Sequence, residues 1–231
     1  MNNKRLLKIA TLFNNDTIVD IGSDHALLPI YLLKNKIIKN AYVIEVNKGP
    51  MENAINNLEK NNLTENAKVI LSDGLRSVDK FKEDNVGIVI AGMGGNLIRD
   101  IIKNDIDKFK GNTLYLQPNN NEENLRVFLN ENNFKIQKEL LVKDDKIIYS
   151  ILVIYPNEEK QVLSNEEIMF GLPIEEIELF KEKWNEELNH LISINEKIKK
   201  SKNENKMIIE KIKKIEKKIG YFKISILLSW S

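Results

Sequence analysis

The chain of 231 residues has no cysteine, two histidines and five prolines. The absence of cysteine excludes a disulfide framework, a thiolate metal site and a thiol nucleophile. The histidines and acidic residues show no metal-ligand spacing, so no metal is expected. No run of about 18 apolar residues is present, and the sequence therefore predicts no membrane-spanning helix. The first residues also lack the apolar core of a signal peptide, and a cytoplasmic enzyme is the interpretation favoured.

Charge is balanced, with a formal net charge of +1, which neither indicates nor excludes a nucleic-acid partner. Apolar residues make up 42% of the chain, enough for a substantial core. A chain of this length accommodates one domain of ordinary size and an appendage. The excess of Asn, Lys and Ile is typical of AT-rich coding sequence, so the number of lysines is not used as a sign of RNA binding.

Strand and helix patterns alternate over the first 155 residues. Strands are expected at about 17–21, 41–46, 67–72, 86–91 and 113–117, and helices at 26–34, 50–61, 96–103 and 122–132. Such alternation requires right-handed crossovers and a mostly parallel sheet covered on both faces. Two more strands, 134–141 and 146–155, are separated only by residues 142–145, which predicts a hairpin. An α/β domain over 1–156, with a seven-stranded sheet ending in a hairpin, is typical of Rossmann-like methyltransferases rather than dehydrogenases.

Beyond a polar linker that contains Pro156, the chain becomes helical and highly charged, and residues 162–231 are expected to form a second domain. Residues 164–190 contain eight Glu and two Lys, whereas residues 196–223 contain eleven Lys and four Glu. In the second segment apolar residues recur at spacings of four and three, at Ile208, Ile212, Ile215, Ile219, Phe222 and Ile226. This pattern predicts an antiparallel coiled coil that turns near 201–205. The lysines are either neutralised by the acidic helix, the interpretation favoured, or hold an RNA backbone.

Polar residues follow the first expected strand at the place where open α/β sheets bind ligands. Asp20 lies near the end of the strand, and Gly22 ends it because a residue without a Cβ turns most easily there. The residues after the glycine, Ser23, Asp24 and His25, are able to present side chains or amides to a ligand.

The ends of the next strands carry comparable groups. Glu45, followed by Val46, ends the second strand, where an acid can accept hydrogen bonds from both hydroxyls of a ribose. Asp73 and Gly74 follow the third strand, where the carboxylate can accept a hydrogen bond from an adenine amino group. The fourth and fifth strands end in Ala91-Gly92-Met93-Gly94-Gly95 and Gln117-Pro118-Asn119. Together these groups predict a pocket for a nucleoside-containing cofactor along one rim of the sheet.

Each group also has a purely structural interpretation. Asp20 or Asp24 could cap the following helix, and His25 could be a satisfied side chain at its start. Glu45 could be an exposed strand end, and Asp73 a turn residue. The agreement of five consecutive strand ends favours a ligand site.

The first turn distinguishes between cofactors. A dinucleotide usually requires glycines spaced as G-x-G-x-x-G, with its pyrophosphate at a helix N-terminus. Here the turn has one glycine, Gly22, and Asp24 stands where a diphosphate would lie. Negative charge repels phosphate but suits a sulfonium and an ammonium, so the sequence favours S-adenosylmethionine over NAD.

From about Arg5 to Tyr155 the chain resembles the tRNA (adenine-22-N1)-methyltransferase family, TrmK. The resemblance is carried by residues 20–26 (DIGSDHA) with Leu28-Pro29, Gly49-Pro50 with Ala54, Asp73-Gly74-Leu75, residues 91–95 (AGMGG), Gln117-Pro118-Asn119 and Leu125-Arg126. Phe170-Gly171 and the helical pair resemble the C-terminal extension of that family. The chain departs from the family pattern at Leu172-Pro173 and at Asn47-Lys48, outside the strand-end motifs.

The resemblance implies methyl transfer from S-adenosylmethionine to N1 of adenine 22 in tRNA, by a class I methyltransferase fold with a C-terminal antiparallel coiled coil. Residues expected to bind the cofactor are Asp20, Gly22, Ser23, Glu45, Val46, Asp73, Gly74, Ala91, Gly92, Met93 and Gly94. Those expected to act on the target base are Asp24, His25, Gln117 and Asn119. Met93 or Tyr115 is expected to supply apolar contact with the base.

Two other functions remain open. One is a methyltransferase that acts on another RNA or on a small substrate, and the other is a non-catalytic adaptor that binds S-adenosylmethionine and RNA. In each case the expected state is a monomer or weak dimer.

Overall fold

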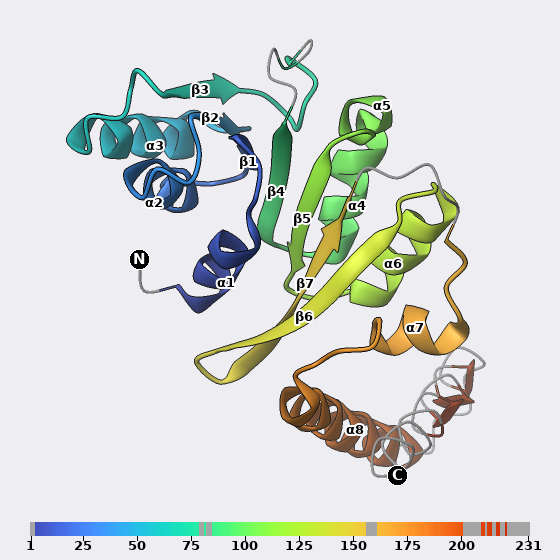
Figure 1. Cartoon of the computed structure of the whole chain (residues 1–231). Helices are drawn as coiled ribbons and strands as arrows, with labels where there is room; N and C mark the ends of the chain where they lie inside the picture. The colour runs from blue at the N-terminus through green and yellow to red at the C-terminus, as the bar shows by residue number, and fades with distance from the viewer. Residues whose placement is uncertain are drawn as a thin grey trace. The chain divides into compact units, whose positions relative to one another are not determined.

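The computed structural model describes residues 3–78, 81, 85–155 and 161–200, together with 209–210, 212–213, 216–217 and 220. The chain divides into two compact units, Met1–Pro173 and Ile174–Ser231 (Figure 1). Among the described helices, none has the length and apolar character needed to cross a membrane.

Seven strands of the first unit form one sheet in the order β3-β2-β1-β4-β5-β7-β6. They are β1 (Thr17–Ile21), β2 (Asn40–Glu45), β3 (Ala67–Leu71), β4 (Val86–Met93), β5 (Thr113–Pro118), β6 (Ile136–Asp144) and β7 (Ile147–Ile154). The first five run parallel to one another, and β7 is antiparallel to both β5 and β6. The predicted Rossmann-like sheet with its terminal hairpin is therefore confirmed.

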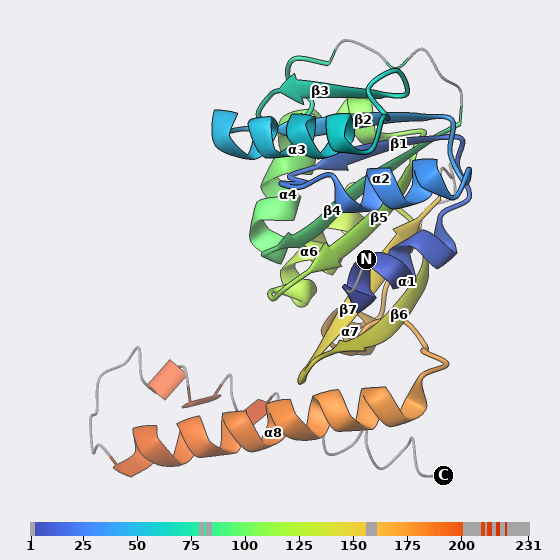
Figure 2. The ribbon, with the colours of Figure 1, turned by 90° about the vertical axis from the view of Figure 1, so that its left-hand side faces the viewer.

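Helices cover both faces of this sheet (Figure 2). In the first unit they are α1 (Lys4–Leu12), α2 (Leu27–Lys34), α3 (Lys48–Lys60), α4 (Gly95–Asn104), α5 (Ile106–Phe109), α6 (Glu122–Glu131) and α7 (Asn165–Phe170). Apolar residues of α1 and α2 pack on one face, whereas α4, α5 and α6 pack on the other. Because both faces are covered, the central strands are apolar almost throughout: β1 is buried at all five positions.

The hairpin turn differs from its prediction. We expected residues 142–145 to form the turn, but β6 continues to Asp144 and pairs there with Ile147. Only Asp145 and Lys146 remain between the strands, and Asp145 has φ +58°. Two-residue hairpins favour left-handed residues because this geometry matches the twist of the flanking strands, and aspartate tolerates it.

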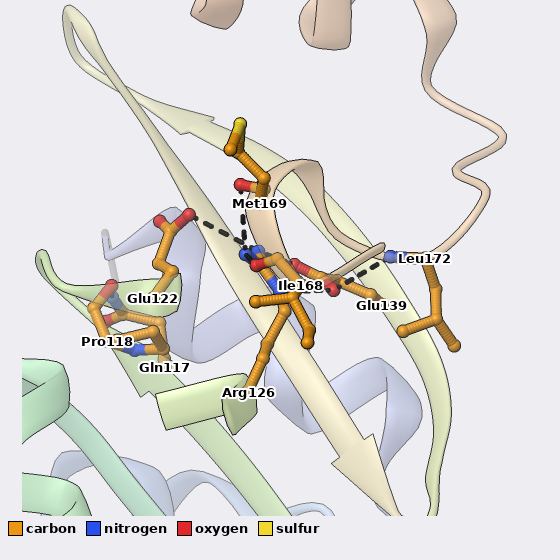
Figure 3. Close-up of polar contacts among 8 residues, drawn as sticks. All are labelled: Gln117, Pro118, Glu122, Arg126, Glu139, Ile168, Met169 and Leu172. Atoms are coloured by element: carbon orange, nitrogen blue, oxygen red, sulfur yellow. Dashed lines mark hydrogen bonds and ion pairs between the residues drawn. The ribbon is translucent and has the colours of Figure 1, made fainter. Parts of the chain in front are cut away.

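A buried ion pair joins α6 to β6. Arg126 is fully buried and donates Nε to Glu139 Oε2 at 3.1 Å and Nη2 to Oε1 of the same carboxylate (Figure 3). The guanidinium also donates Nη1 to the Ile168 carbonyl at 3.0 Å, and the Leu172 amide donates to Glu139 Oε2 at 3.2 Å. The pair therefore fixes the segment around α7 to the sheet.

These contacts place the end of the first unit at Pro173, beyond the boundary expected at 156 and inside the second domain expected from 162. The side chain of Gln161 also accepts from the Ile136 amide at 2.9 Å, and Leu163 and Phe170 are buried. Ser164 starts α7 with a capping box completed by Glu167. The proline-containing linker thus connects two parts of one unit, because the residues after it complete the core.

The second unit contains α8 (Ile177–Lys200), in which Trp184 and Leu191 are buried. Beyond it, the described residues from 209 to 220 are helical, and Lys199 Nζ donates to Glu216 Oε1 at 2.7 Å. The turn predicted near 201–205 and most of the predicted seam, including Ile208 and Ile215, lie outside the described residues.

We expect Arg126→Met to lower the free energy of unfolding by about 3–5 kcal/mol, because it leaves the Glu139 carboxylate buried without its cation. Urea denaturation followed by circular dichroism measures the change. Arg99→Met is the matched control, since Arg99 pairs with Asp100 at the surface and its loss should leave stability nearly unchanged. An equal effect of the two substitutions would contradict the role assigned to the pair.

Candidate active site

The carboxyl ends of the parallel strands form one rim of the sheet. Strand β1 pairs with β2 on one side and β4 on the other, so the strand order reverses at β1. Ligands of open α/β sheets bind beside such a reversal, because the connections leave a crevice there. The predicted strand-end motifs all lie on this rim.

The turn after β1, residues 22–26, is called the cofactor turn below. Gly22 has φ +73°, a backbone conformation that strains residues with a Cβ, and a Cβ built on it would lie 1.9 Å from Met93 Cε. Asp24 and Ala26 also have positive φ, at +54° and +52°. Ala26 is the N-cap of α2 and makes no side-chain cap hydrogen bond, so the interpretation of Asp24 as the cap of this helix is wrong.

Asp20 and Glu45 are buried carboxylates on neighbouring strands, only 6% and 4% exposed. Asp20 accepts a hydrogen bond from the Ser23 hydroxyl, and Glu45 accepts one from the amide of Asp24. Glu45 is therefore not an exposed strand end. It holds the cofactor turn against the end of β2.

Burial shifts the protonation of both groups. It raises the pKa of Asp20 to about 7, with the Ser23 hydrogen bond opposing the shift and the charge of Glu45 adding to it. Burial also raises the pKa of Glu45, opposed by the Asp24 amide and reinforced by the Asp24 charge. Two neighbouring acids in a poorly solvated place favour a ligand that carries positive charge.

Asp24 and His25 lie at the open side of the cofactor turn, with 56% and 51% of their side chains exposed. His25 Nε2 lies 3.3 Å from Asp24 Oδ2. Helix α3 supports the pair, because Asn53 Nδ2 donates to Asp24 Oδ1 at 3.4 Å and Asn57 Nδ2 donates to the His25 carbonyl at 3.1 Å. The sequence carried no signal for these two asparagines.

The ends of β2 and β3 lie next to each other. The Ser72 amide donates to the Glu45 carbonyl at 2.7 Å, and Val46 is 60% exposed beside it. Asp73 is half-exposed and pairs with Arg76 at 3.1 Å. Asp73 is therefore still compatible either with a turn residue or with a ligand contact. Val46 offers an exposed apolar surface.

Strand β4 does not stop at residue 91 as expected but continues through a bulge to Met93. Gly92 occupies the bulge with φ +79°. Its amide donates to Gln117 Oε1 at 3.1 Å, and its carbonyl accepts from Asn119 Nδ2 at 2.6 Å. Bulges beside active sites redirect side chains, and here the bulge places Met93 over Gly22.

Gly92, Met93, Gln117 and Asn119 are called the target wall below. The backbone amide of Asn119 donates to the Met93 carbonyl at 2.7 Å, so hydrogen bonds join all four residues. Gln117 is 1% exposed, whereas Asn119 lies at the surface of the rim. Gly94 follows the wall as the N-cap of α4.

Arg5 of α1 also contacts the target wall, and the sequence analysis gave it no role. Its Nη1 donates to Gln117 Oε1 at 3.1 Å and to Asn119 Oδ1 at 3.2 Å. The residues are more than 110 positions apart, so no local pattern reveals the contact. The only signal was that the family resemblance begins near Arg5.

Tyr115 does not take part in the rim, and its predicted contact with the base is wrong. Its ring is fully buried and stacks on that of Phe13, the C-cap of α1, with the ring centroids 4.9 Å apart. Its hydroxyl donates to Asn15 Oδ1 at 2.9 Å, and burial raises its pKa to about 12. Across the described residues, no cluster of three or more His, Asp or Glu side chains is arranged to hold a metal.

Comparison with known proteins agrees with this geometry. The family model described as TrmK, tRNA (adenine(22)-N(1))-methyltransferase, matches residues 18–219. The tRNA (adenine(22)-N(1))-methyltransferase of Bacillus subtilis (strain 168) is 33% identical over 203 residues, which is 84% of each chain.

Solved structures show the same relationship. The structure of M. capricolum TrmK in complex with S-adenosyl-homocysteine is 31% identical and covers 96% of both chains with a TM-score of 0.81. Streptococcus pneumoniae Sp1610 in complex with S-adenosyl-L-methionine is 33% identical, covering 95% of this chain and 100% of that one with a TM-score of 0.77. The sequence, the fold and the strand-end motifs together show that this chain belongs to the TrmK family of tRNA (adenine(22)-N1)-methyltransferases.

Proposed function

We propose that this chain transfers a methyl group from S-adenosylmethionine to N1 of adenine 22 in tRNA. The observation that carries the proposal is the pair of buried carboxylates, Asp20 and Glu45, behind a one-glycine turn at the strand reversal. Two relatives were solved with S-adenosylmethionine or its product, and the Bacillus subtilis relative is named for the tRNA reaction.

The residues present fit this cofactor. Glu45 is assigned to the ribose hydroxyls, and the exposed Val46 that follows it is assigned to apolar contact with the purine. Asp20 and Glu45 supply negative charge that suits an ammonium or sulfonium. The remaining contacts are assigned to the cofactor turn with Ser23, to Asp73 and Gly74 near the adenine, and to the backbone from Ala91 to Gly94. When bound, the cofactor supplies an electrophilic methyl group.

On the other side of the site, the target wall and the Asp24–His25 pair are assigned to the adenine. N1 of adenine already carries a lone pair, so the protein mainly has to orient the base. Asp24 is exposed enough to reach the base and to stabilise the positive charge that forms on it. Base-modifying enzymes take the base out of its stack, and Met93 supplies apolar contact for the extruded adenine.

We also propose that residues 174–231 form the antiparallel coiled coil predicted from the sequence. The Lys199–Glu216 ion pair supports it, because it joins the end of α8 to a residue in the next helical segment. The basic second segment then either neutralises the acidic residues of α8 or contacts tRNA. A tRNA substrate places the reaction in the cytoplasm, and a monomer or weak dimer remains our expectation.

The direct test is transfer of a labelled methyl group to an unmodified tRNA transcript with adenine at position 22. We expect incorporation into this transcript and none into the same transcript with guanine 22, followed by mapping of the modified nucleotide. Incorporation independent of position 22 would indicate a different methyltransferase. Binding of both cofactor and tRNA without incorporation would indicate an adaptor.

Glu45→Gln should weaken cofactor binding by about tenfold or more, because hydrogen bonds to a charged carboxylate contribute about 1.5–3 kcal/mol. Glutamine keeps an oxygen that accepts the Asp24 amide, so the turn should survive. Isothermal titration calorimetry with S-adenosylhomocysteine measures the affinity, and the exposed Glu59→Gln of α3 is the control. An affinity within twofold of the parent protein would remove Glu45 from the site.

Cofactor binding should strengthen as the pH rises from about 6 to about 7.5. The pKa of Asp20 is raised to about 7 by burial, so below that pH this carboxyl is largely neutral in the free protein. A cationic ligand favours the ionised form, and binding therefore releases a proton in this range. Calorimetry across the range measures the slope, and Asp20→Asn corrects for titration of the cofactor itself. Equal slopes in the two proteins would contradict the assignment.

A further inference from the structure

Arg5 lies behind the target wall and bonds to both of its amide side chains. We propose that Arg5 is a positioning residue for methyl transfer, which fixes the target wall relative to the cofactor turn without touching either substrate. The proposal rests on the proposed function and assigns the part of the fold that holds the target base in place.

Arg5 is itself held in place by the hairpin of β6 and β7. Its Nε lies 3.4 Å from Asp144 Oδ2, and its guanidinium lies 4.6 Å from the centre of the Tyr149 ring. Its side chain is only 21% exposed. Because β5 pairs with β7 only as far as Leu116 opposite Leu152, the hairpin extends past the end of β5 toward α1 (Figure 1). Arg5 thus joins α1, the hairpin and the end of β5.

The guanidinium helps to orient the two side-chain amides. It has donors and no acceptor, so the oxygens of Gln117 and Asn119 must face it. The NH2 groups bond elsewhere: Gln117 Nε2 donates to the Pro118 carbonyl at 2.8 Å and to Asn119 Oδ1 at 3.2 Å, and Asn119 Nδ2 donates to the Gly92 carbonyl at 2.6 Å. A single guanidinium nitrogen, Nη1, bonds both amide oxygens and so acts together with the Gly92 backbone to set both orientations.

The bulge at Gly92 connects the Gln117 and Asn119 side chains to the place where base and cofactor would meet. Gln117 Oε1 accepts from the Gly92 amide, and Asn119 contacts the carbonyls of Gly92 and Met93. The Met93 side chain in turn fills the space above Gly22 of the cofactor turn. A continuous series of contacts therefore runs from Arg5 to the place where base and cofactor would meet.

A direct grip on an RNA phosphate is the competing role for an arginine at this rim. Here Nη1 is bonded to two amide oxygens, and Nε lies beside a carboxylate. These contacts oppose rotation of the guanidinium toward an RNA backbone, because rotation would separate it from the Asp144 carboxylate and break both hydrogen bonds of Nη1. The geometry therefore favours positioning.

The test compares Arg5→Met and Arg5→Lys with Lys4→Met, which removes an exposed cation from the adjacent position of α1. Single-turnover methyl transfer is measured at saturating tRNA, and cofactor and tRNA affinities are measured separately. We expect Arg5→Met to slow transfer by about 10- to 100-fold with cofactor affinity unchanged, because small misplacements of reacting groups have effects of this size. Arg5→Lys should recover part of the rate, and Lys4→Met should transfer at the parent rate.

A rate for Arg5→Met within threefold of the parent would overturn the proposal. So would a loss that saturating tRNA restores, which would make Arg5 an RNA contact. If Arg5→Met fails to fold or to bind cofactor, Arg5→Lys decides instead: a partial loss of rate with both affinities unchanged supports the proposal, and the full parent rate, or a loss that saturating tRNA restores, overturns it. Asn119→Ala gives a second check, since adding Arg5→Met to it should cause little further loss if both act through one wall. Absence of transfer by the parent protein would refute the proposed function itself, and with it this role.

Discussion

Two carboxylates buried side by side at the strand reversal are the constraint on which the site depends. Asp20 and Glu45 are removed from water at the carboxyl ends of β1 and β2. Unpaired negative charge is unfavourable there, and the protein compensates with a hydroxyl, a backbone amide and a raised pKa. The two acids therefore favour a cationic ligand, and their negative charge disfavours a diphosphate at this place.

The turn after β1 and the bulge of β4 lie beside these carboxylates. A positive φ at Gly22 bends the chain back toward Glu45, and the bulge at Gly92 brings the Met93 side chain over Gly22. The amides of Gln117 and Asn119 hold the bulge, and Arg5 holds the amides. Hydrogen bonds thus connect Arg5, Gln117 and Asn119 to the bulge, and packing of Met93 connects the bulge to the turn after β1.

Much of the sheet and the strand-end motifs could be predicted from the sequence, because buried parallel strands are short apolar runs that end in glycine and polar residues. Features that depend on contacts between residues far apart in the chain could not be predicted. Tyr115 was indistinguishable from a rim residue until its ring was found under α1, and Arg126 and Glu139, which complete the unit beyond the linker, are buried charges without a local signal. The hairpin turn was misplaced because Val142 to Asp144 are equally compatible with strand and turn.

The most direct measurement is a crystal structure of the full chain with S-adenosylhomocysteine, grown in the presence of an equal concentration of NAD. The account predicts that S-adenosylhomocysteine binds at the ends of β1 and β4. Its ribose hydroxyls should contact Glu45, and its amino-acid portion should lie at the cofactor turn near Asp20. NAD bound at that place, or S-adenosylhomocysteine bound away from both Asp20 and Glu45, would contradict this account.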